Sequence, residues 1–280
     1  MGQRYDVIVK ADQPVGDYWM RAIPQKACSA NSNQLGIKGI VRYGSSFSHS
    51  HAEPTTTAYA YTDECADVPL ASLVPVLSKN VGPADQQTSE AVSVAKNADN
   101  FFEWQLNGTS FLVDWNNPAV LNVYNNNTLA IKAQKNLIEL PKRDEWFYLL
   151  ITEPGLPVPH PIHLHGHDFY ILGSGTGAYT GLEPLQTINP PRRDVANLPG
   201  GGWLMLAWKA DNPGNWLMHC HIGWHTLQGF ALQFLELESE MLTTPGLLDQ
   251  QLPENCNAWN QYAASDHPVQ GVDGLVDSGL

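Results

Sequence analysis

Histidine and cysteine residues crowd into two short stretches of the chain. Seven of the ten histidines and one of the four cysteines lie there. The stretches are PHPIHLHGHDF, with His160, His163, His165 and His167, and HCHIGWH, with His219, Cys220, His221 and His225. Imidazole is the commonest metal ligand in proteins, and a thiolate adds a soft donor. Because the sequence has no C-x₂-C pair of the structural zinc type, a copper site with two histidines and one cysteine is the better interpretation.

The order of His219, Cys220 and His221 in the second stretch can be explained if the stretch is an extended strand. Alternate side chains of a strand face opposite sides. Cys220 would then face one way, while His219 and His221 face the other. One strand could therefore serve two metal sites back to back, with only a short covalent path from the Cys220 sulfur to either flanking histidine.

The first stretch follows the same rule. His163 and His165 are two residues apart, so they share one face of an extended segment. His160 lies between Pro159 and Pro161, whose restricted backbones hold it extended and fix its direction. Both stretches are therefore predicted to be strands that aim imidazoles at metal ions.

Short segments of β type must position these residues. Each is rich in aromatic or aliphatic side chains and is bounded by Gly, Pro, Asn or Asp. They are RYDVIVKA (4–11), DYWMRA (17–22), GIKGIVRYG (36–44), LAIKA (129–133), EWFYLLIT (145–152), HDFYILGS (167–174), WLMLAWKA (203–210) and GFALQFLEL (229–237). The pattern predicts an all-β antiparallel sandwich or barrel. The best helix signal lies around residues 254–264, after Pro253. The core is expected to hold Trp203, Trp208, Trp216 and Trp224.

The strand pattern is lost over residues 66–100, which carry several prolines and the polar run ADQQTSEA. We expect a linker at residues 76–100. Residues 1–75 before it are too few for a complete sandwich of about 100 residues. The block 101–280 is larger and richer in strand patterns, so it is predicted to be a complete domain.

Composition narrows the class of protein. The chain has 280 residues, 43% hydrophobic and 15% charged, which indicates a globular fold. A formal net charge of −13 argues against binding to nucleic acid or anionic membranes. No apolar run approaches the length of about 18 residues that a membrane helix needs. The first residues, MGQRYDVIVKADQ, lack a signal peptide's basic start and apolar centre, so any signal is expected upstream. Glycosylation sequons at Asn107 and Asn126 agree with secretion.

The two metal stretches together resemble a known family. HPIHLHGHDF and HCHIGWHTLQGF are similar to the C-terminal copper signatures of the multicopper oxidases, and of ascomycete laccases in particular. The segments GQRYDVIV, NPPRRD, GGWLMLAWKADNPGNWLMHCHI and the final DSGL also resemble laccase segments. The resemblance covers nearly the whole chain. It implies cupredoxin-like Greek-key sandwiches, with the end of the second domain in residues 1–75 and the third domain in residues 101–280.

The resemblance also implies a role for each residue of the motifs. A type 1 blue copper would be bound by His160, Cys220 and His225. The type 2 copper would take His163, and the type 3 pair would take His165, His219 and His221.

Two further positions have roles in the family. Phe230 occupies the axial position, where a methionine would bind weakly and a phenylalanine has no donor, so a high reduction potential is expected. His225 would present its ring edge to the substrate and accept its electrons. The family does not use the last histidine of the first motif as a ligand, so His167 is expected to support the ligands from behind.

The remaining histidines and cysteines have less specific settings. His49 and His51 form an H-x-H pair in a polar loop without aromatic context, so metal binding there is disfavoured. His267 is expected in an exposed tail. The secreted setting and the family pattern favour a disulfide between Cys28 and Cys65. The resemblance also implies that Cys256 bonds to an N-terminal laccase domain, which would then be a partner of this chain.

The resemblance leaves two functions open. A laccase-type oxidase would take single electrons from phenols or arylamines and reduce oxygen to water at a trinuclear copper centre. That centre takes eight histidines in the family, and this chain offers four, so an N-terminal domain must supply the rest. The alternative is a single blue-copper module that transfers electrons without reducing oxygen. The DSGL end resembles the family's C-terminal plug, which would place Asp277 and Leu280 in the channel to the trinuclear centre; a disordered tail is the other interpretation.

Overall fold

The computed structural model describes residues 2–27, 32–33, 36–44, 53–64, 67–132, 135–244, 246 and 251–264. The chain divides into two compact units, one formed by Asp6–Pro69 and the other by Met1–Tyr5 with Leu70–Leu280. In the smaller unit, β1 (Gly16–Ala22) and β2 (Ile37–Tyr43) form an antiparallel pair. Both strands were predicted from their sequence.

Residues 4–11 do not form the strand that their alternating pattern predicts. Val7, Ile8 and Val9 are 76%, 80% and 67% exposed, so no sheet or core covers these three residues within the smaller unit. A strand needs a hydrogen-bonded neighbour as well as a suitable side-chain pattern, and the pattern alone does not supply one.

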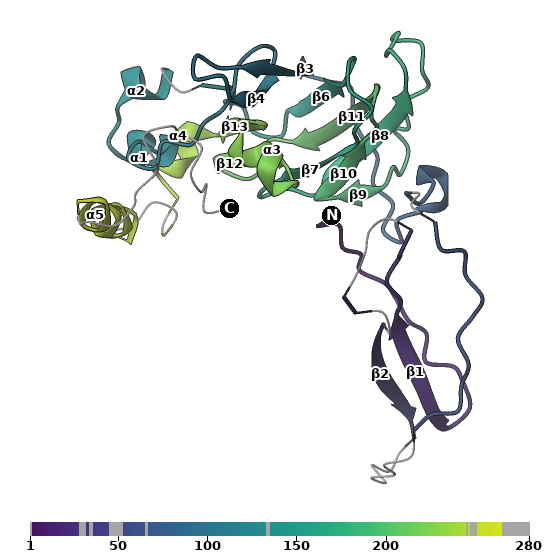
Figure 1. Ribbon diagram of the computed structural model, residues 1–280. Coiled ribbons are helices and arrows are strands. Elements are labelled where there is room, and N and C mark those ends of the chain that lie inside the picture. Colours follow the sequence, from purple (N-terminus) through teal and green to yellow (C-terminus); the bar gives the residue numbers. More distant parts are fainter. Residues whose placement is uncertain are drawn as a thin grey trace. The chain divides into compact units, whose positions relative to one another are not determined.

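The larger unit holds two sheets, as far as the structure describes it (Figure 1). One has the order β10-β7-β12-β13-β5 and the other the order β4-β3-β6-β11-β8-β9. The first sheet consists of β5 (Leu137–Leu140), β7 (His160–Leu164), β10 (Val195–Leu198), β12 (Gly214–Cys220) and β13 (Ala231–Glu236). The second consists of β3 (Gln86–Lys96), β4 (Phe102–Leu106), β6 (Trp146–Thr152), β8 (Phe169–Thr176), β9 (Arg192–Arg193) and β11 (Gly202–Lys209). Most pairings are antiparallel, as predicted, while β3 with β6 and β5 with β13 are parallel.

The core lies between these two sheets. Phe147 of β6, Trp208 of β11 and Phe234 of β13 pack together across the interface, with ring centroids 4.9–5.5 Å apart. In β6 buried and partly exposed residues alternate, as one face of a sandwich strand requires. In β11 nearly every residue is buried, because a second apolar cluster around Trp203 and Met205 covers its outer face. The architecture is therefore the predicted β-sandwich.

The linker predicted at residues 76–100 is wrong for its second half, which forms β3. This strand pairs with β4 on one side and β6 on the other. Polar residues dominate its sequence because alternate side chains are partly exposed, while Glu90 and Val92 are buried. A strand whose outer face meets water needs few apolar residues, which the composition-based interpretation overlooked.

The helices are short and lie mainly at the ends of strands. They are the 3₁₀ turn Leu70–Ser72 and the α-helices α1 (Ala119–Tyr124), α2 (Thr128–Lys132), α3 (Gly223–Leu227), α4 (Glu238–Met241) and α5 (Gln251–Ala263). The long helix α5 was predicted. Residues 129–132 of the segment LAIKA, predicted as a strand, lie in α2, because Asn127 Oδ1 accepts a hydrogen bond from Ala130 N and starts a helical turn. Five residues are too few for periodicity to distinguish the two. No helix among the described residues is both long and apolar enough to span a membrane.

Candidate metal centre

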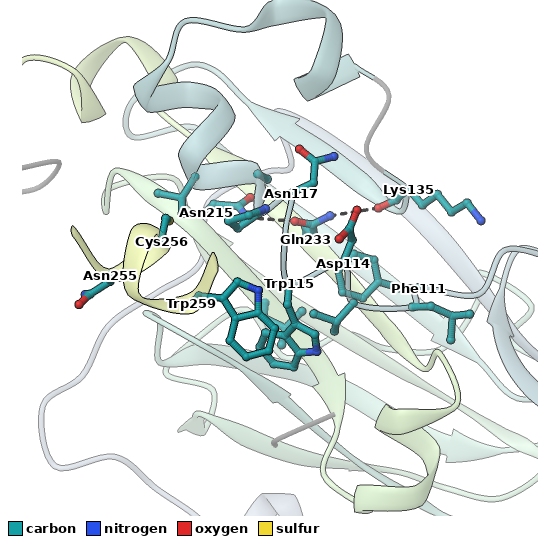
Figure 2. A pocket seen from close by; sticks show the side chains of 16 residues that line it. Phe111, Asp114, Trp115, Asn117, Lys135, Asn215, Gln233, Asn255, Cys256 and Trp259 are labelled. Carbon is teal, nitrogen blue, oxygen red and sulfur yellow. Dashed lines mark hydrogen bonds between the residues drawn. The ribbon is translucent and has the colours of Figure 1, made fainter. Parts of the chain in front are cut away.

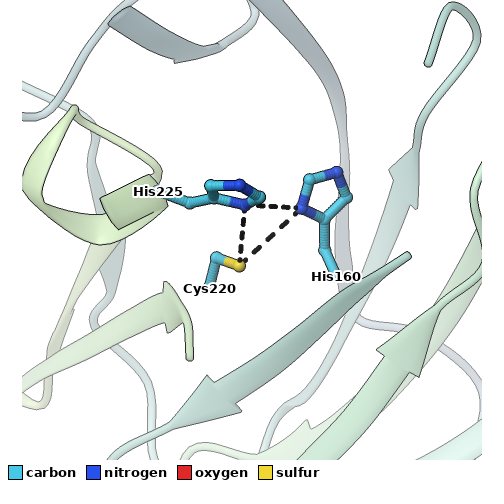
Figure 3. A group of neighbouring side chains, drawn as sticks. All are labelled: His160, Cys220 and His225. Atoms are coloured by element: carbon cyan, nitrogen blue, oxygen red, sulfur yellow. Dashed lines mark hydrogen bonds between the residues drawn. The ribbon is translucent and has the colours of Figure 1, made fainter. Parts of the chain in front are cut away.

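One histidine, one cysteine and a second histidine converge on a single point inside the larger unit (Figure 3). His160 begins β7, Cys220 ends β12, and His225 lies in the short helix α3 that follows. The distance between the Nδ1 atoms of His160 and His225 is 3.1 Å. The Cys220 Sγ atom lies 3.5 Å from His225 Nδ1 and 3.7 Å from His160 Nδ1.

These distances fit a shared metal ion. Donors about 2.0–2.3 Å from one ion in a trigonal plane lie about 3.5–3.8 Å from one another. The three observed separations are at or slightly below that range, so an ion among the atoms would need only a small outward adjustment. Two imidazole nitrogens with one sulfur form the donor set that suits copper in a trigonal site.

The triad of His160, Cys220 and His225 is enclosed. His160 and Cys220 are completely buried. Burial lowers the pKa of His160 to about 4, and the nearby His225 acts in the same direction. Burial also lowers the pKa of His225. Both rings are therefore neutral at neutral pH, and each has a lone pair for a metal.

The thiol of Cys220 needs a partner before it becomes an anion. Burial raises its pKa to about 12, and a hydrogen bond from the Ile222 backbone only partly opposes this. A thiolate is the form that binds metals, so a cation at the triad must displace the proton. A buried, protonated Cys220 thiol beside two neutral imidazoles is the arrangement expected of a set of metal ligands.

Aromatic rings close the triad from the side. Trp104 of β4 packs on His225 with ring centroids 4.2 Å apart and meets His160 edge-on at 4.9 Å. Phe230 is buried, with its ring 5.0 Å from that of His160 and 5.8 Å from that of Trp104. Phe230 therefore lies beside the triad, as its position in the motif predicts, and offers no donor atom. The sequence interpretation did not single out Trp104, because it lies far from both motifs in the chain.

Four further histidines gather near the opposite face of the same strands. His219 pairs with His163 across β12 and β7, and Cys220 pairs with Ile162. The donor atoms of three of these histidines lie close enough to share an ion, with the Nε2 atoms of His165 and His219 only 3.2 Å apart. The ring of His221 lies 5.6 Å from that of His163 and 5.7 Å from that of His219. We call His163, His165, His219 and His221 the histidine face.

Backbone carbonyls fix which nitrogen two of these rings offer. His163 Nδ1 lies 2.7 Å from the Asp194 carbonyl, and His219 Nδ1 lies 2.9 Å from the Cys220 carbonyl. An Nδ1–H that donates to a carbonyl leaves Nε2 as the acceptor, which is the usual arrangement behind a metal-bound histidine. Burial lowers the pKa of His219 to about 4. Partial desolvation of the His165 ring, with the neighbouring His163 and His221, also lowers the pKa of His165, so both rings are neutral donors.

His167 lies apart from both groups. Its Nε2 atom is 2.9 Å from Glu236 Oε2, with the two side chains 6% and 0% exposed. The position agrees with a supporting role, while Glu236 was missed by the sequence interpretation. The signal was a single acidic residue inside the otherwise apolar end of GFALQFLEL.

Several predicted residues lie elsewhere or outside the described residues. Trp224, expected in the core, is 75% exposed beside His225. The sequon residues Asn107 and Asn126 are exposed turn residues with positive φ. The predictions for Cys28, Cys65, His49, His51, His267, Asp277 and Leu280 fall outside the described residues.

Cys256 is described and half-buried, and it forms no disulfide. It lies on α5 at the edge of a cavity of about 580 Å³, together with Trp115, Asn215 and Trp259 (Figure 2). The indole of Trp259 donates a hydrogen bond to Asn116, which holds α5 against the loop before α1. The predicted bond between Cys256 and another domain stays a prediction.

Comparison with known proteins identifies the class. The family model described as multicopper oxidase matches residues 83–240, and a second model with the same description matches residues 1–46. The chain belongs to the multicopper oxidase family. This confirms the resemblance found in the sequence and implies copper as the metal.

Several individual relatives carry the name laccase. The chain is 44% identical over 282 residues to Laccase-1 of Botryotinia fuckeliana, covering 98% of this chain and 48% of the relative. It is 41% identical to Oxidoreductase OpS5 of Beauveria bassiana, covering 100% and 47%. The crystal structure of a laccase from Botrytis aclada covers 98% of this chain and 50% of its own, with 38% identity and a TM-score of 0.74, which confirms the cupredoxin-like fold. The chain spans about half the length of the curated relatives it matches.

Proposed function

We propose that the chain works as the blue-copper part of a laccase-type multicopper oxidase, a benzenediol:oxygen oxidoreductase. His160, Cys220 and His225 hold the type 1 copper in this proposal. The convergence of one buried cysteine and two neutral imidazoles on a single point is the observation that carries it. Copper supplies the one-electron and oxygen chemistry when bound.

The protein's own residues provide the route for electrons. His225 is partly exposed on α3, next to the exposed ring of Trp224, so its edge is accessible to a phenol or arylamine. Each substrate molecule gives up one electron and one proton, from the O–H of a phenol or the N–H of an arylamine, and four such oxidations balance the reduction of one oxygen molecule to two waters. Cys220 connects through its own backbone to His219 on the adjoining histidine face.

The histidine face is proposed to supply half of the trinuclear centre. His163 takes the type 2 position, and His165, His219 and His221 take the type 3 positions. An N-terminal laccase domain, with Cys256 as one attachment point, provides the other ligands. This part of the proposal is supported by the Nε2 atoms of His165 and His219, which lie 3.2 Å apart.

Copper stoichiometry and oxygen uptake test the proposal. The protein that contains this chain together with the N-terminal domain should bind four coppers, show the blue thiolate band and consume oxygen with a phenol. A complete protein with one copper, a blue band and no oxygen uptake would favour the alternative, a blue-copper module that only transfers electrons. A protein without any blue band would exclude both functions.

Secretion, glycosylation at Asn107 and Asn126, the disulfide between Cys28 and Cys65, and the C-terminal plug at Asp277 and Leu280 belong to the same proposal. Lignin-related phenols are one substrate class for such a secreted enzyme. Deleting the last four residues should change the kinetics of the complete enzyme, and unchanged kinetics would count against the plug. A mass decrease on glycan removal would test the glycosylation.

A further inference from the structure

A buried carboxylate lies behind the histidine face. Glu236 is completely buried near the end of β13, where its Oε2 atom meets His167 Nε2 at 2.9 Å. Its Oε1 atom accepts a hydrogen bond of 2.6 Å from the backbone N–H of Asn212. Burying a carboxylate is costly even when it is paired, and an apolar side chain of similar size would be at least as stable. We therefore expect Glu236 to have a role other than stabilising the fold.

Both contact partners of Glu236, His167 and Asn212, belong to or bind the turn of residues 165–167. His165, Gly166 and His167 form the turn that follows β7. His165 N donates to Leu217 O at 2.9 Å, and Asn212 Nδ2 donates to Gly166 O at 2.9 Å. Together with the contact between His167 and Glu236, every residue of this turn is attached to β12, β13 or the loop before β12.

Trp216 closes the turn from its other side. Its indole N–H donates to Asn212 O at 2.8 Å, so the ring is fixed to the same loop. Gly166 has a φ of +74°, and a Cβ atom there would lie 2.5 Å from the Trp216 ring. The backbone of the turn thus packs directly on the indole, and only glycine fits this conformation and this space.

We propose that Glu236 is a positioning residue for the type 3 copper site. Through His167 and Asn212 it holds the turn that carries His165, so that His165 Nε2 stays 3.2 Å from His219 Nε2. Glu236 and His219 lie on paired strands, in which Gly214 faces Glu236 and His219 faces Ala231. The contact from Glu236 to His167 therefore joins the turn to β13, and β13 pairs with β12, the strand that supplies the second ligand. The metal assignment in this inference rests on the proposed function.

The precision of metal binding explains why such a clamp would matter. Ligand distances in a metal site must hold to within about 0.2 Å. His165 is exposed and lies in the turn after β7, so the strand pairing of β7 does not fix its ring. Loss of groups that orient metal ligands typically weakens metal binding about 10–100-fold.

The test compares two buried carboxylates in the copper-loaded, full-length protein. Glu236→Gln keeps the shape of the side chain and replaces one carboxyl oxygen with an amide nitrogen. The control is Glu153→Gln, since Glu153 is also buried but accepts hydrogen bonds from the backbone of Gly155, Leu156 and Gly201, away from the histidines. The blue thiolate band reports the Cys220 site alone, and total copper per chain reports every site.

Glu236→Gln is expected to bind copper at the histidine face about 10–100-fold more weakly, while the blue band persists. Glu153→Gln is expected to lower the thermal midpoint without changing the ratio of total copper to blue copper. If Glu236→Gln lowers the thermal midpoint and keeps the wild-type ratio, Glu236 is only structural and the inference is wrong.

A second variant covers the case in which Glu236→Gln fails to fold. Asn212→Ala removes the hydrogen bond to Gly166 O but leaves the buried pair intact. It should give a smaller selective loss of copper from the histidine face, and a wild-type ratio would overturn the inference. The wild-type protein separates this result from the proposed function: if it binds no copper beyond the blue site, the proposed function fails, whatever the variants do.

Discussion

The triad and the histidine face use the same two strands, but they differ in burial and in how many of their proposed metal ligands this chain supplies. The triad draws one residue each from β7, β12 and α3, and its two strand residues are fully buried. The histidine face lies nearer the surface, with His165 exposed and the other rings partly exposed. The period of two along β12 separates the sites, since Cys220 turns inward and its neighbour His219 turns to the other side. The triad has all its proposed ligands in this chain, so the core of the larger unit can enclose it. The histidine face needs further ligands from another domain, so it must stay accessible.

Burial also gives the two sites different chemistry without metal. Inside the triad it raises the pKa of Cys220 to about 12 and lowers that of His160 to about 4. On the histidine face the pKa values of His165 and His219 are lowered, so these two rings need lose no proton before a metal binds. The triad is therefore expected to depend on its metal more strongly than the face does.

The largest effect should follow from replacing the one sulfur donor. Cys220→Ser removes the thiolate, so the blue band should disappear and one copper per chain should be lost, with oxidation of phenols abolished. Copper on the histidine face should remain. Absorption spectra and metal analysis check both expectations. Cys256→Ser is the matched control and should keep the blue band; if Cys220→Ser also empties the histidine face, the two sites are not separable as the comparison requires.

Acid should weaken the copper-free protein through both sites. The pKa values of His160 and His219 are about 4 in the folded protein and about 6.5 when unfolded. The unfolded state therefore binds more protons than the folded state between pH 6.5 and 4. The contribution of these two histidines to the free energy of unfolding is fully present above pH 6.5 and falls as the pH drops towards 4. Each group contributes up to about 1.4 kcal/mol per pH unit in this window.

Thermal midpoints measured across this window check the acid prediction. Copper holds the ligand rings deprotonated, so the copper-loaded protein should keep its midpoint to a lower pH than the copper-free protein. Parallel curves for the two forms would show that other groups control the acid limb.

A smaller effect is expected at the side of the triad. Phe230→Met offers a thioether close to the copper position, so the reduction potential of the blue copper should fall. The stability cost should stay below about 1.5 kcal/mol because the volume is nearly conserved. A redox titration followed through the blue band measures the change. Phe230→Leu provides an apolar control that should keep a high potential, and equal potentials in both variants would exclude an axial effect.

Much of this comparison could be predicted from the sequence because both sites are built from local motifs. The spacing in HCHIGWH assigned Cys220 and His219 to opposite faces, and the structure places them so. Strands with dense apolar alternation, such as β6 and β11, were also predicted correctly.

The predictions that failed depended on distant partners. The strand β3 is polar because one of its faces meets water, and residues 4–11 lack a neighbouring strand despite an apolar pattern. Trp104 reaches the triad through the packing of the two sheets, and Glu236 meets His167 from another strand of the same sheet; no local spacing reveals either contact. Local periodicity shows which face a residue takes, but not what lies opposite it.

The smallest effect should come from the exposed edge of the histidine face. In the copper-free protein, His165→Ala removes a surface side chain, so the free energy of unfolding should change by no more than about 0.5 kcal/mol. The same change at His160 creates a cavity among buried rings and should cost several times more. Denaturant midpoints of the two variants give the difference directly. If His165→Ala proved as costly as His160→Ala, the turn behind the histidine face would be part of the folding core, and exposure would no longer explain why this site can wait for further ligands while the triad is closed.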